Sequence, residues 1–362
     1  MKSIVFYISD HGFGHASRSL ALIENIIQLD KEVKIFIKTG EKQLNFCKAY
    51  LSKFNCDNIY YEIKKNDIGL ILKQGSLDVD KQRLKYELEN WVNSWDYYIN
   101  QEEKFYKENK VDLIISDITP QAFIIGNKLS IKTLAITNFT WYEMYKDFFG
   151  VNYITDKLYE AYNLADEVFL YPLNEPNNLP FKNYKNVGFV ARQANEKFVQ
   201  KIREKYLGNL YKRIIFISVG KSVNLEKEIS IKNDENFYIY TEGLNLKGEN
   251  TCKLSSDTVN VHDYIAASDL LITKAGWSSI SEAVTSRVPL LVVDRQEVIE
   301  DRTTISKLFQ LGIADIIDKS ILYDLSDLNF SQLINKLKSG YLENSFTNDS
   351  HNVATEILKI IR

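Results

Sequence analysis

The sequence predicts an α/β protein with two doubly wound domains, each built on a parallel sheet, that face each other across a cleft. Short β-branched runs alternate with helical patterns along most of the chain, which is typical of a doubly wound sheet. The alternation stops at 171–186, where prolines and asparagines gather, and then restarts. The chain has 362 residues, which is the usual length for two domains.

In the first half, the expected strands are continuous apolar runs, as in a parallel sheet that is buried on both faces. They lie at Ile4–Ile8, Val33–Ile37, Ile59–Ile63, Leu113–Ile115 and Thr133–Ile136. The helices between these strands are expected at Ala16–Leu29, Lys42–Phe54 and Gln121–Leu129.

One long segment interrupts this alternation. The stretch Lys64–Asp80 is polar and is expected to be a loop, and a single helix with an apolar stripe follows it. The stripe is expected either to pack on the sheet or to line an acceptor cleft or contact a membrane surface. Its members are Leu84, Leu88, Trp91, Trp95, Tyr98 and Phe105.

The second half repeats the pattern of the first. Strands are expected at Ile214–Ser218, Phe237–Tyr240, Leu270–Thr273 and Leu290–Val293, with helices at Ser278–Ser286 and near Thr303–Leu311. We therefore expect an N-terminal domain over 1–188 and a C-terminal domain over 189–345. A C-terminal helix, 346–362, is expected to pack back on the first domain.

Composition excludes several classes of protein. The net charge is −3, so the basic surplus of a nucleic-acid-binding protein is missing. The three cysteines form no CxxC pair, which favours reduced thiols in a cytoplasmic protein over a zinc site. No apolar run approaches the roughly 20 residues that span a bilayer. A membrane contact would therefore be peripheral, at the inner face.

The segment Asp10–Arg18 lies where the first strand turns into the first helix, and ligands collect at such strand ends. Gly12 and Gly14 let the backbone approach a ligand closely. Two of the chain's four histidines, His11 and His15, lie in the same turn, and histidine suits general base catalysis near neutral pH. We expect His15 to be the base and His11 to contact substrate, with His11 as the alternative base.

Two further strand ends supply polar side chains. Asp117 follows Leu113–Ile115 and is expected either to orient the base histidine or to cap the helix after Pro120. Asn138 and Trp141 follow the next strand, and they are expected either to receive the acceptor or to form a turn and a packing anchor.

The second candidate site is Thr273–Glu282, which follows a strand and opens a helix. Gly276 allows a close approach, and Ser278 and Ser279 supply hydroxyl and N–H groups for a diphosphate. Glu282 is expected either to accept hydrogen bonds from a ribose diol or to act as an ordinary first-turn helix acid. Other expected substrate contacts are Gly220, Lys221, Ser222, His262, Lys274, Trp277, Glu300 and Asp301.

These residues resemble those of GT-B fold glycosyltransferases. Thr273–Glu282 is similar to the donor signature of the UDP-glycosyltransferases, and it resembles the T-K-A-G stretch of the MurG branch. Gly12–His15 resembles the G-x-G-H loop that carries the base in that fold. The segments His11–Arg18 and Ser116–Trp141 are also similar to the transferase-like domain of arabinokinases. The glutamine of the family's Asp/Glu-Gln pair is absent near Glu300, which leaves the donor sugar undefined.

The resemblance implies an inverting hexosyltransferase that takes a UDP-sugar and needs neither a metal ion nor a cofactor. It implies that the diphosphate is held by Gly276, Ser278 and Ser279. It also implies that Glu282 binds the ribose and that Lys274 lies next to the phosphates. The acceptor is open between a small molecule, a lipid-linked sugar and a peptide. Gly12–Arg18 also fits the G-x-G-H-x-x-R of nucleotide-sugar hydrolases, so a hydrolase or a 2-epimerase is an alternative. The third hypothesis is a module that binds a nucleotide sugar without catalysing a reaction.

Overall fold

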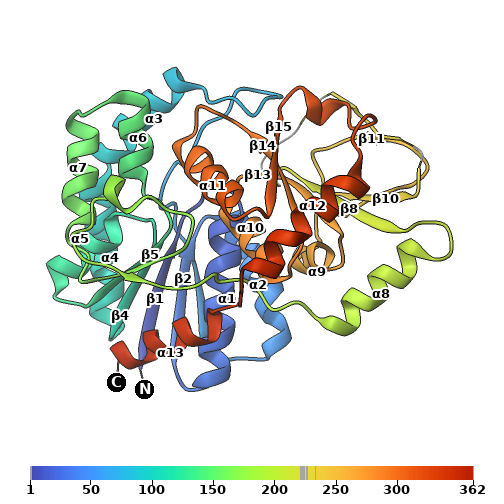
Figure 1. Ribbon diagram of the computed structural model, residues 1–362. Coiled ribbons are helices and arrows are strands. Elements are labelled where there is room, and N and C mark those ends of the chain that lie inside the picture. Colours follow the sequence, from blue (N-terminus) through green and yellow to red (C-terminus); the bar gives the residue numbers. More distant parts are fainter. Residues whose placement is uncertain (1, 221–224, 226, 233, 362) are drawn as a thin grey trace. The chain divides into compact units, whose positions relative to one another are not determined.

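The computed structural model describes residues 2–220, 225, 227–232 and 234–361. Its chain divides into two compact units. The first comprises Met1–Ile71, Val79–Val190 and Asp349–Arg362, and the second comprises Leu72–Asp78 and Ala191–Asn348. Figure 1 shows the elements of both units along the sequence.

The first unit is built on a parallel sheet with the strand order β3-β2-β1-β4-β5-β6-β7. The five apolar runs that were predicted as strands form β1 to β5. The two short strands β6 and β7, at one edge of the sheet, were not predicted. The bounds are β1 Ser3–Ile8, β2 Lys34–Thr39, β3 Ile59–Ile63, β4 Leu113–Asp117, β5 Thr133–Thr137, β6 Glu167–Leu170 and β7 Lys185–Asn186.

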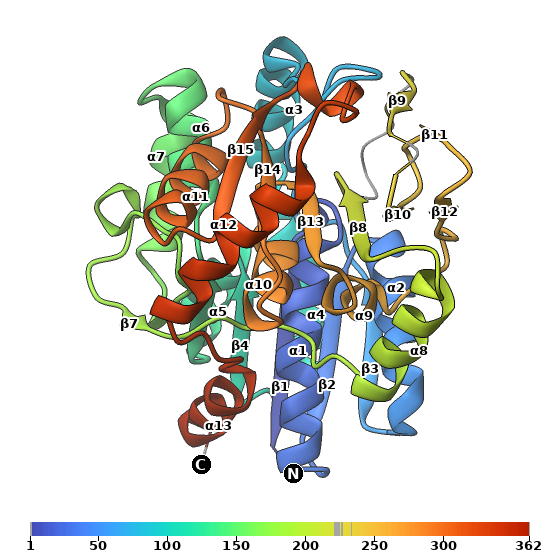
Figure 2. The same cartoon turned by 45° about the vertical axis from the view of Figure 1, so that its right-hand side comes forward.

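The helices of the first unit fall into two contacting groups, as expected when helices cover both faces of a doubly wound sheet. Helices α1 (Gly14–Leu29), α2 (Glu41–Leu51) and α13 (Ser350–Ile360) form one group, in which α13 contacts α1 (Figure 2). The other group contains α3 Lys81–Asn93, α4 Trp95–Glu108, α5 Gln121–Leu129, α6 Trp141–Phe149 and α7 Tyr153–Tyr162. Single turns of 3-10 helix lie at Ser52–Phe54 and Pro176–Asn178.

The single helix predicted over the apolar stripe was wrong. Two helices, α3 and α4, meet at Ser94, whose hydroxyl donates to the carbonyl of Trp91 at 2.7 Å. The stripe kept its helical spacing across the break, which is why periodicity alone did not reveal it. Five of the six stripe residues are buried, so the stripe packs inside the unit rather than facing a membrane: Leu84, Leu88, Trp91, Trp95 and Tyr98.

The second unit repeats the same topology. Its main sheet is parallel with the order β12-β10-β8-β13-β14-β15, and a small sheet pairs β11 with β9. The strands are β8 Arg213–Ser218, β9 Ile229–Ser230, β10 Asn236–Tyr240, β11 Leu246–Lys247, β12 Thr251–Lys253, β13 Leu270–Lys274, β14 Leu290–Asp294 and β15 Ala314–Asp318. The helices are α8 Glu196–Leu207, α9 Val261–Ala266, α10 Trp277–Thr285, α11 Ile299–Gln310 and α12 Phe330–Glu343, with a 3-10 turn at Ile321–Tyr323.

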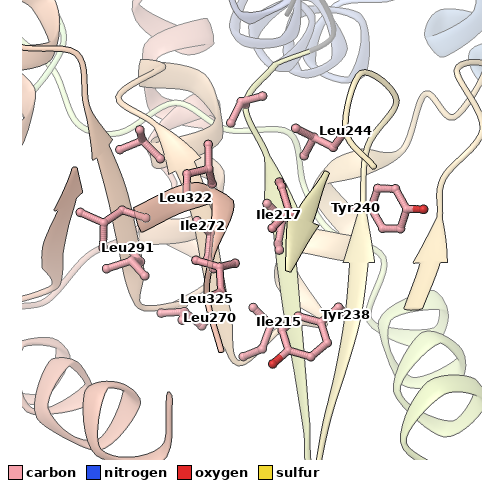
Figure 3. Close-up of a cluster of buried hydrophobic side chains, with 14 of the residues drawn as sticks. Ile215, Ile217, Tyr238, Tyr240, Leu244, Leu270, Ile272, Leu291, Leu322 and Leu325 are labelled. Carbon is pink, nitrogen blue, oxygen red and sulfur yellow. The ribbon is translucent and has the colours of Figure 1, made fainter. Parts of the chain in front are cut away.

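One hydrophobic cluster of the second unit lies on one face of this sheet. Figure 3 shows Ile215 and Ile217 of β8, Leu270 and Ile272 of β13 and Leu291 of β14 projecting into the cluster. Leu322 and Leu325 cover them from the segment after β15. Full burial of such side chains contributes about 1.5–3 kcal/mol each, so this cluster holds the strand order in place.

Both main sheets have one topological switch point, where the strand order reverses direction. In the first unit it lies between β1 and β4, and Ile8 pairs with Asp117 there. In the second unit it lies between β8 and β13, with Ser218 opposite Thr273. Ligands of open α/β sheets bind outside the carboxyl ends of the strands at such points. Both sequence-predicted sites begin there.

A buried ion cluster fixes α4 to the first sheet. Glu102 of α4 is 1% exposed and accepts from Lys38 of β2 and from Lys64, both at 2.7 Å. The hydroxyl of Tyr7 in β1 also donates to it. Lys38 is itself fully buried, so its charge depends on these carboxylate contacts and on Glu62 at 2.9 Å.

We therefore expect Glu102→Gln to lower the free energy of unfolding by about 3 kcal/mol, because it leaves buried lysine charge without its main counter-charge. Urea unfolding at pH 7 measures this. Glu103→Gln is the matched control on the same helix, since Glu103 pairs with Lys128 near the surface and should change little. An equal effect of the two substitutions would contradict the cluster's role.

Candidate functional site

The first site forms around a buried carboxylate at the carboxyl end of β4. Asp117 is 3% exposed, and its Oδ1 lies 2.8 Å from Nδ1 of His15. The Nε of Arg18 donates to Oδ2 at 2.7 Å, and Nη2 of Arg18 donates to Oδ1. The hydroxyl of Ser19 donates to Oδ2 at 3.2 Å. One carboxylate therefore holds three side chains of the first turns of α1.

Electrostatics explain why this carboxylate is tolerated. Burial alone would raise the pKa of Asp117, but the charges of Arg18 and His15 outweigh it and hold the pKa at about 2. Asp117 is thus an anion at neutral pH and the strongest acceptor beside His15. The Asp117 anion favours a proton on Nδ1 of His15, which leaves Nε2 as the basic nitrogen, whereas Nη2 of Arg18, 2.9 Å from the same Nδ1, can only donate and opposes it.

The local backbone aims Asp117 at α1. The residue after it, Ile118, has φ 59°, a left-handed conformation that is unusual for a β-branched side chain. The hydroxyl of Tyr162 donates to the Ile118 carbonyl at 2.6 Å and holds the turn. The alternative reading of Asp117 as a helix cap is wrong, because α5 begins after Pro120 without a side-chain cap.

His11 has a different hydrogen-bonding pattern from His15. The backbone N–H of Leu70 donates to Nδ1 of His11 at 3.2 Å, which places the proton of the neutral ring on Nε2. Gly69 is pressed against the same ring, since a Cβ at Gly69 would lie 2.3 Å from Nδ1. Opposite tautomers are thus favoured for His11 and His15, and only His15 presents Nε2 as an acceptor of a proton.

Of the two glycines in this turn, Gly12 has φ 65° and Gly14 begins α1, two residues earlier than predicted. The carbonyl of Gly12 accepts from Nε2 of Gln43 at 2.8 Å. His15 consequently lies in the first turn of α1, directly after a turn that needs a glycine.

Asn138 and Trp141 both take part in internal contacts. Oδ1 of Asn138 accepts from Nη1 of Arg18 at 2.6 Å. Trp141 is fully buried, and its Nε1 donates to Oδ2 of Asp67 at 3.0 Å. The Trp141 ring lies 5.7 Å from the ring of His11 and 6.5 Å from that of His15. These contacts favour the packing interpretation of Trp141.

Sequence reasoning missed a carboxyl pair in this site, Asp10 and Asp67. Asp10 accepts from the backbone N–H groups of Gly40 and Asn66, the latter at 2.6 Å. Burial and the nearby Asp10 raise the pKa of Asp67 to about 7. Asp10 is the second residue after β1, and Asp67 follows β3 by a few residues, so the rule of strand carboxyl ends would have found both.

In the second site, Lys274 is the last residue of β13 and lies between two glycines. A Cβ on Gly220, which has φ 93°, would lie 3.2 Å from Cε of Lys274. Gly276 is the N-cap of α10, and a Cβ there would lie 3.7 Å from the same atom. Burial and then the charge of Arg295 lower the pKa of Lys274 to about 8. Within the described part of the chain, no carboxylate forms an ion pair with Lys274.

The N-terminus of α10 supplies the other predicted donor contacts. Trp277 and Ser278 are buried at its start, and Ser279 is half-buried. The interpretation of Glu282 as a first-turn acid is wrong, because it lies in the second turn and accepts from Nε of Arg192 at 2.8 Å. Arg192 lies 90 residues earlier in the chain, and no local pattern indicated it.

The remaining residues that were predicted to contact substrate lie in different environments. Both oxygens of Asp301 accept from Arg295 at 2.5 Å, so this carboxylate is used inside the unit and does not favour a role in sugar binding. Glu300 is half-buried at the start of α11. His262 is buried in α9 beside Asp263. Lys221 and Ser222 lie outside the described residues.

The acidic pair in Asp78-Val79-Asp80 does not form a joint site. Asp78 pairs with Lys319 of the second unit, and Asp80 caps α3 by accepting from the backbone N–H of Arg83 at 3.0 Å.

No helix of the described residues is long and apolar enough to cross a membrane.

One prediction follows from the Asp67 carboxyl. Its pKa of about 7 lies above the unfolded value of about 3.9, so the folded state binds the proton more tightly. The free energy of unfolding should therefore gain a component that falls as the pH rises from about 4 to about 7. Asp67→Asn should flatten this fall in urea titrations at pH 5 and pH 8. Asp57→Asn, at an exposed position, should not, and an unchanged slope for Asp67→Asn would contradict the assignment.

Comparison with known proteins gives one sequence relative and many structural ones. No family model matches the chain. An L-arabinokinase of Arabidopsis thaliana is 25% identical over 309 residues, which are 81% of this chain but only 28% of that protein. The chain thus corresponds to little more than a quarter of the relative's length.

Solved structures match over nearly the whole chain. UGT89C1 of Arabidopsis thaliana, solved with UDP, superimposes with a TM-score of 0.62 at 13% identity, covering 100% of both chains. CalG4, the calicheamicin glycosyltransferase, gives a TM-score of 0.63 at 12% identity over 100% of this chain and 98% of its own. The glycosyltransferase of kitacinnamycin gives 0.61 at 13% identity, with 99% of each chain covered. The chain therefore has the GT-B fold of the UDP-glycosyltransferases.

Proposed function

We propose that the protein is a glycosyltransferase that moves a sugar from a UDP-sugar to an acceptor hydroxyl. The observation that carries the proposal is Lys274, a half-buried ammonium between Gly220 and Gly276 at a switch point, which forms no ion pair with a carboxylate of the described residues. Partial burial and the nearby charge of Arg295 both disfavour this ammonium, and a bound anion would offset them. The diphosphate of a nucleotide sugar fits both this charge and the adjacent helix N-terminus.

In this proposal the second unit, predicted as residues 189–345, binds the donor. Ser278 and Ser279 offer N–H and hydroxyl groups at the start of α10, and Lys274 meets the charge that develops on the leaving diphosphate. Glu282 binds the ribose, and Arg192 fixes the orientation of its carboxylate. The leaving charge is met by protein groups, so the proposed reaction uses no metal ion.

The first unit, predicted as residues 1–188 with the C-terminal helix, holds the acceptor and the base. Nε2 of His15 takes the proton of the acceptor hydroxyl as its oxygen attacks the anomeric carbon and the bond to the diphosphate breaks. Asp117 holds Nδ1 and stabilises the imidazolium that forms. A single displacement of this kind inverts the anomeric configuration.

The comparisons also bear on the class of substrate. UGT89C1 has been solved with UDP-L-rhamnose and with quercetin, a small molecule that carries hydroxyl groups. A UDP-sugar and a small hydroxylated acceptor are therefore the first pair to test. Contact with the membrane through the apolar stripe is not part of the proposal, because that stripe is buried.

Nucleotide-sugar hydrolysis is the second candidate, because Arg18 completes the G-x-G-H-x-x-R pattern that this chain shares with nucleotide-sugar hydrolases. The guanidinium of Arg18 lies 2.9 Å from Nδ1 of His15. The same His15 would then activate water. Free sugar released without acceptor, at the rate of transfer with acceptor, selects hydrolysis. Product formation only with acceptor selects transfer.

We expect His15→Gln to lower the turnover number at least 100-fold, because general base catalysis contributes about that much or more. Donor binding should be unchanged, since the donor lies in the second unit. UDP release in the presence of acceptor measures turnover. His351→Gln, on the exposed face of α13, is the control. Turnover of His15→Gln within a few-fold of the unchanged protein would remove His15 as the base.

We expect Lys274→Met to weaken UDP binding about tenfold, the equivalent of about 1.4 kcal/mol. The UDP affinity of the unchanged protein should also fall as the pH rises through about 8, because the ammonium loses its proton there. Titration calorimetry at pH 7 and pH 9 measures both effects. Lys336→Met, at a surface ion pair with Asp315, should bind UDP normally. An unchanged affinity for Lys274→Met would contradict the donor assignment.

A further inference from the structure

The segment Leu72–Asp78, which we call the arm, belongs to the second unit although both of its flanks belong to the first. In the sequence it forms part of one polar stretch, Lys64–Asp80, for which a loop was expected. Its two ends lie close together, since the N–H of Lys73 donates to the carbonyl of Asp78 at 2.9 Å. Within the first unit, the N–H of Asp80 donates to the carbonyl of Ile71 at 2.8 Å. The arm is thus a closed turn with a short stem.

Leu77 anchors the arm in the second unit. Its side chain is 4% exposed and belongs to the same hydrophobic cluster as Leu322 and Leu325. Leu72 packs against that cluster from the other end of the arm. Asp78 adds an ion pair with Lys319, which follows β15. Full burial of a leucine side chain contributes about 1.5–3 kcal/mol to stability, so Leu77 keeps the arm attached to the core of the second unit.

The loop Asn66–Leu70, immediately before the arm, contacts the proposed acceptor site in the first unit. The backbone N–H groups of Asn66 and Asp67 donate to Oδ2 of Asp10 at 2.6 and 3.2 Å. The N–H of Leu70 donates to Nδ1 of His11 at 3.2 Å. Three backbone amides of this loop therefore hold the side chains next to His15.

Only Ile71 separates the residue that contacts His11 from the first residue of the arm. Consecutive Cα atoms are 3.8 Å apart and each peptide unit is planar, so only the backbone rotations at Ile71 and its two neighbours lie between these contacts. The connection between the arm and Leu70 is therefore short.

We propose that the arm is a mechanical link through which the second unit sets the position of the 66–70 loop and of His11. Leu77 is a positioning residue in this link, since it acts through the loop and touches no substrate. The structural link does not depend on the proposed function, but its catalytic consequence rests on it. Under the alternative, the contacts inside the first unit hold the loop on their own and the arm only covers the core of the second unit.

Hydrogen exchange of the ligand-free protein separates these two accounts. We expect Leu77→Ala to raise the exchange rates of the Asn66, Asp67 and Leu70 amides at least tenfold, because their hydrogen bonds to Asp10 and His11 open more often. Leu337→Ala is the matched control: it truncates another buried leucine of the same cluster, on α12 rather than in the arm, and should raise exchange only in the second unit. Rates at 66–70 that stay within twofold in Leu77→Ala would overturn the proposal.

A milder variant covers the case in which Leu77→Ala does not fold. Leu77→Val removes less apolar volume and should raise exchange of the same three amides by a smaller factor. An effect of Leu77→Val confined to the second unit would also overturn the link.

Hydrogen exchange in the presence of UDP tests whether ligand binding in the second unit affects the 66–70 loop through the arm. UDP should lower exchange at 66–70 in the unchanged protein, whereas Leu77→Ala should bind UDP with equal affinity and show no change at 66–70. Equal protection in both proteins would overturn the coupling. A failure of UDP to bind at all would remove the proposed function and leave the ligand-free comparison intact.

Discussion

The carboxylate of Asp117 is the constraint on which the first site depends. It is buried at the end of a central strand, where an uncompensated charge would cost several kcal/mol. The compensation comes from Arg18 and His15, both in the first turns of α1. The start of α1 is therefore fixed against the end of β4, and the basic nitrogen of His15 has one orientation. The left-handed backbone at Ile118 is the local cost of this arrangement.

The two units use the same physical solution twice. Each places a tight turn and a helix N-terminus at the point where its strand order reverses. In the first unit that point carries an anion, Asp117, that orients a base. In the second it carries a cation, Lys274, which forms no ion pair with a carboxylate of the described residues and whose pKa burial and the charge of Arg295 lower. These opposite charges match the proposed roles of the two units: the first activates the nucleophile, and the second binds the leaving diphosphate.

Much of this arrangement could be predicted from the sequence, because buried parallel strands leave continuous apolar runs and strand ends mark the ligand edge. That rule predicted the neighbourhood of His15 and Asp117, which contact each other, and the position of Lys274 and Gly276 at the end of β13. Arg192 could not be found, since its contact with Glu282 joins residues 90 positions apart. The break between α3 and α4 was missed because the apolar stripe continues through it. The arm was taken for a polar loop because one leucine, Leu77, provides its anchor.

A crystal structure of the protein with UDP tests the central claim most directly. The account predicts the diphosphate at the N-terminus of α10, within hydrogen-bonding distance of Nζ of Lys274, and the ribose hydroxyls on Glu282. A nucleotide bound in the first unit, or a diphosphate remote from Lys274, would contradict it.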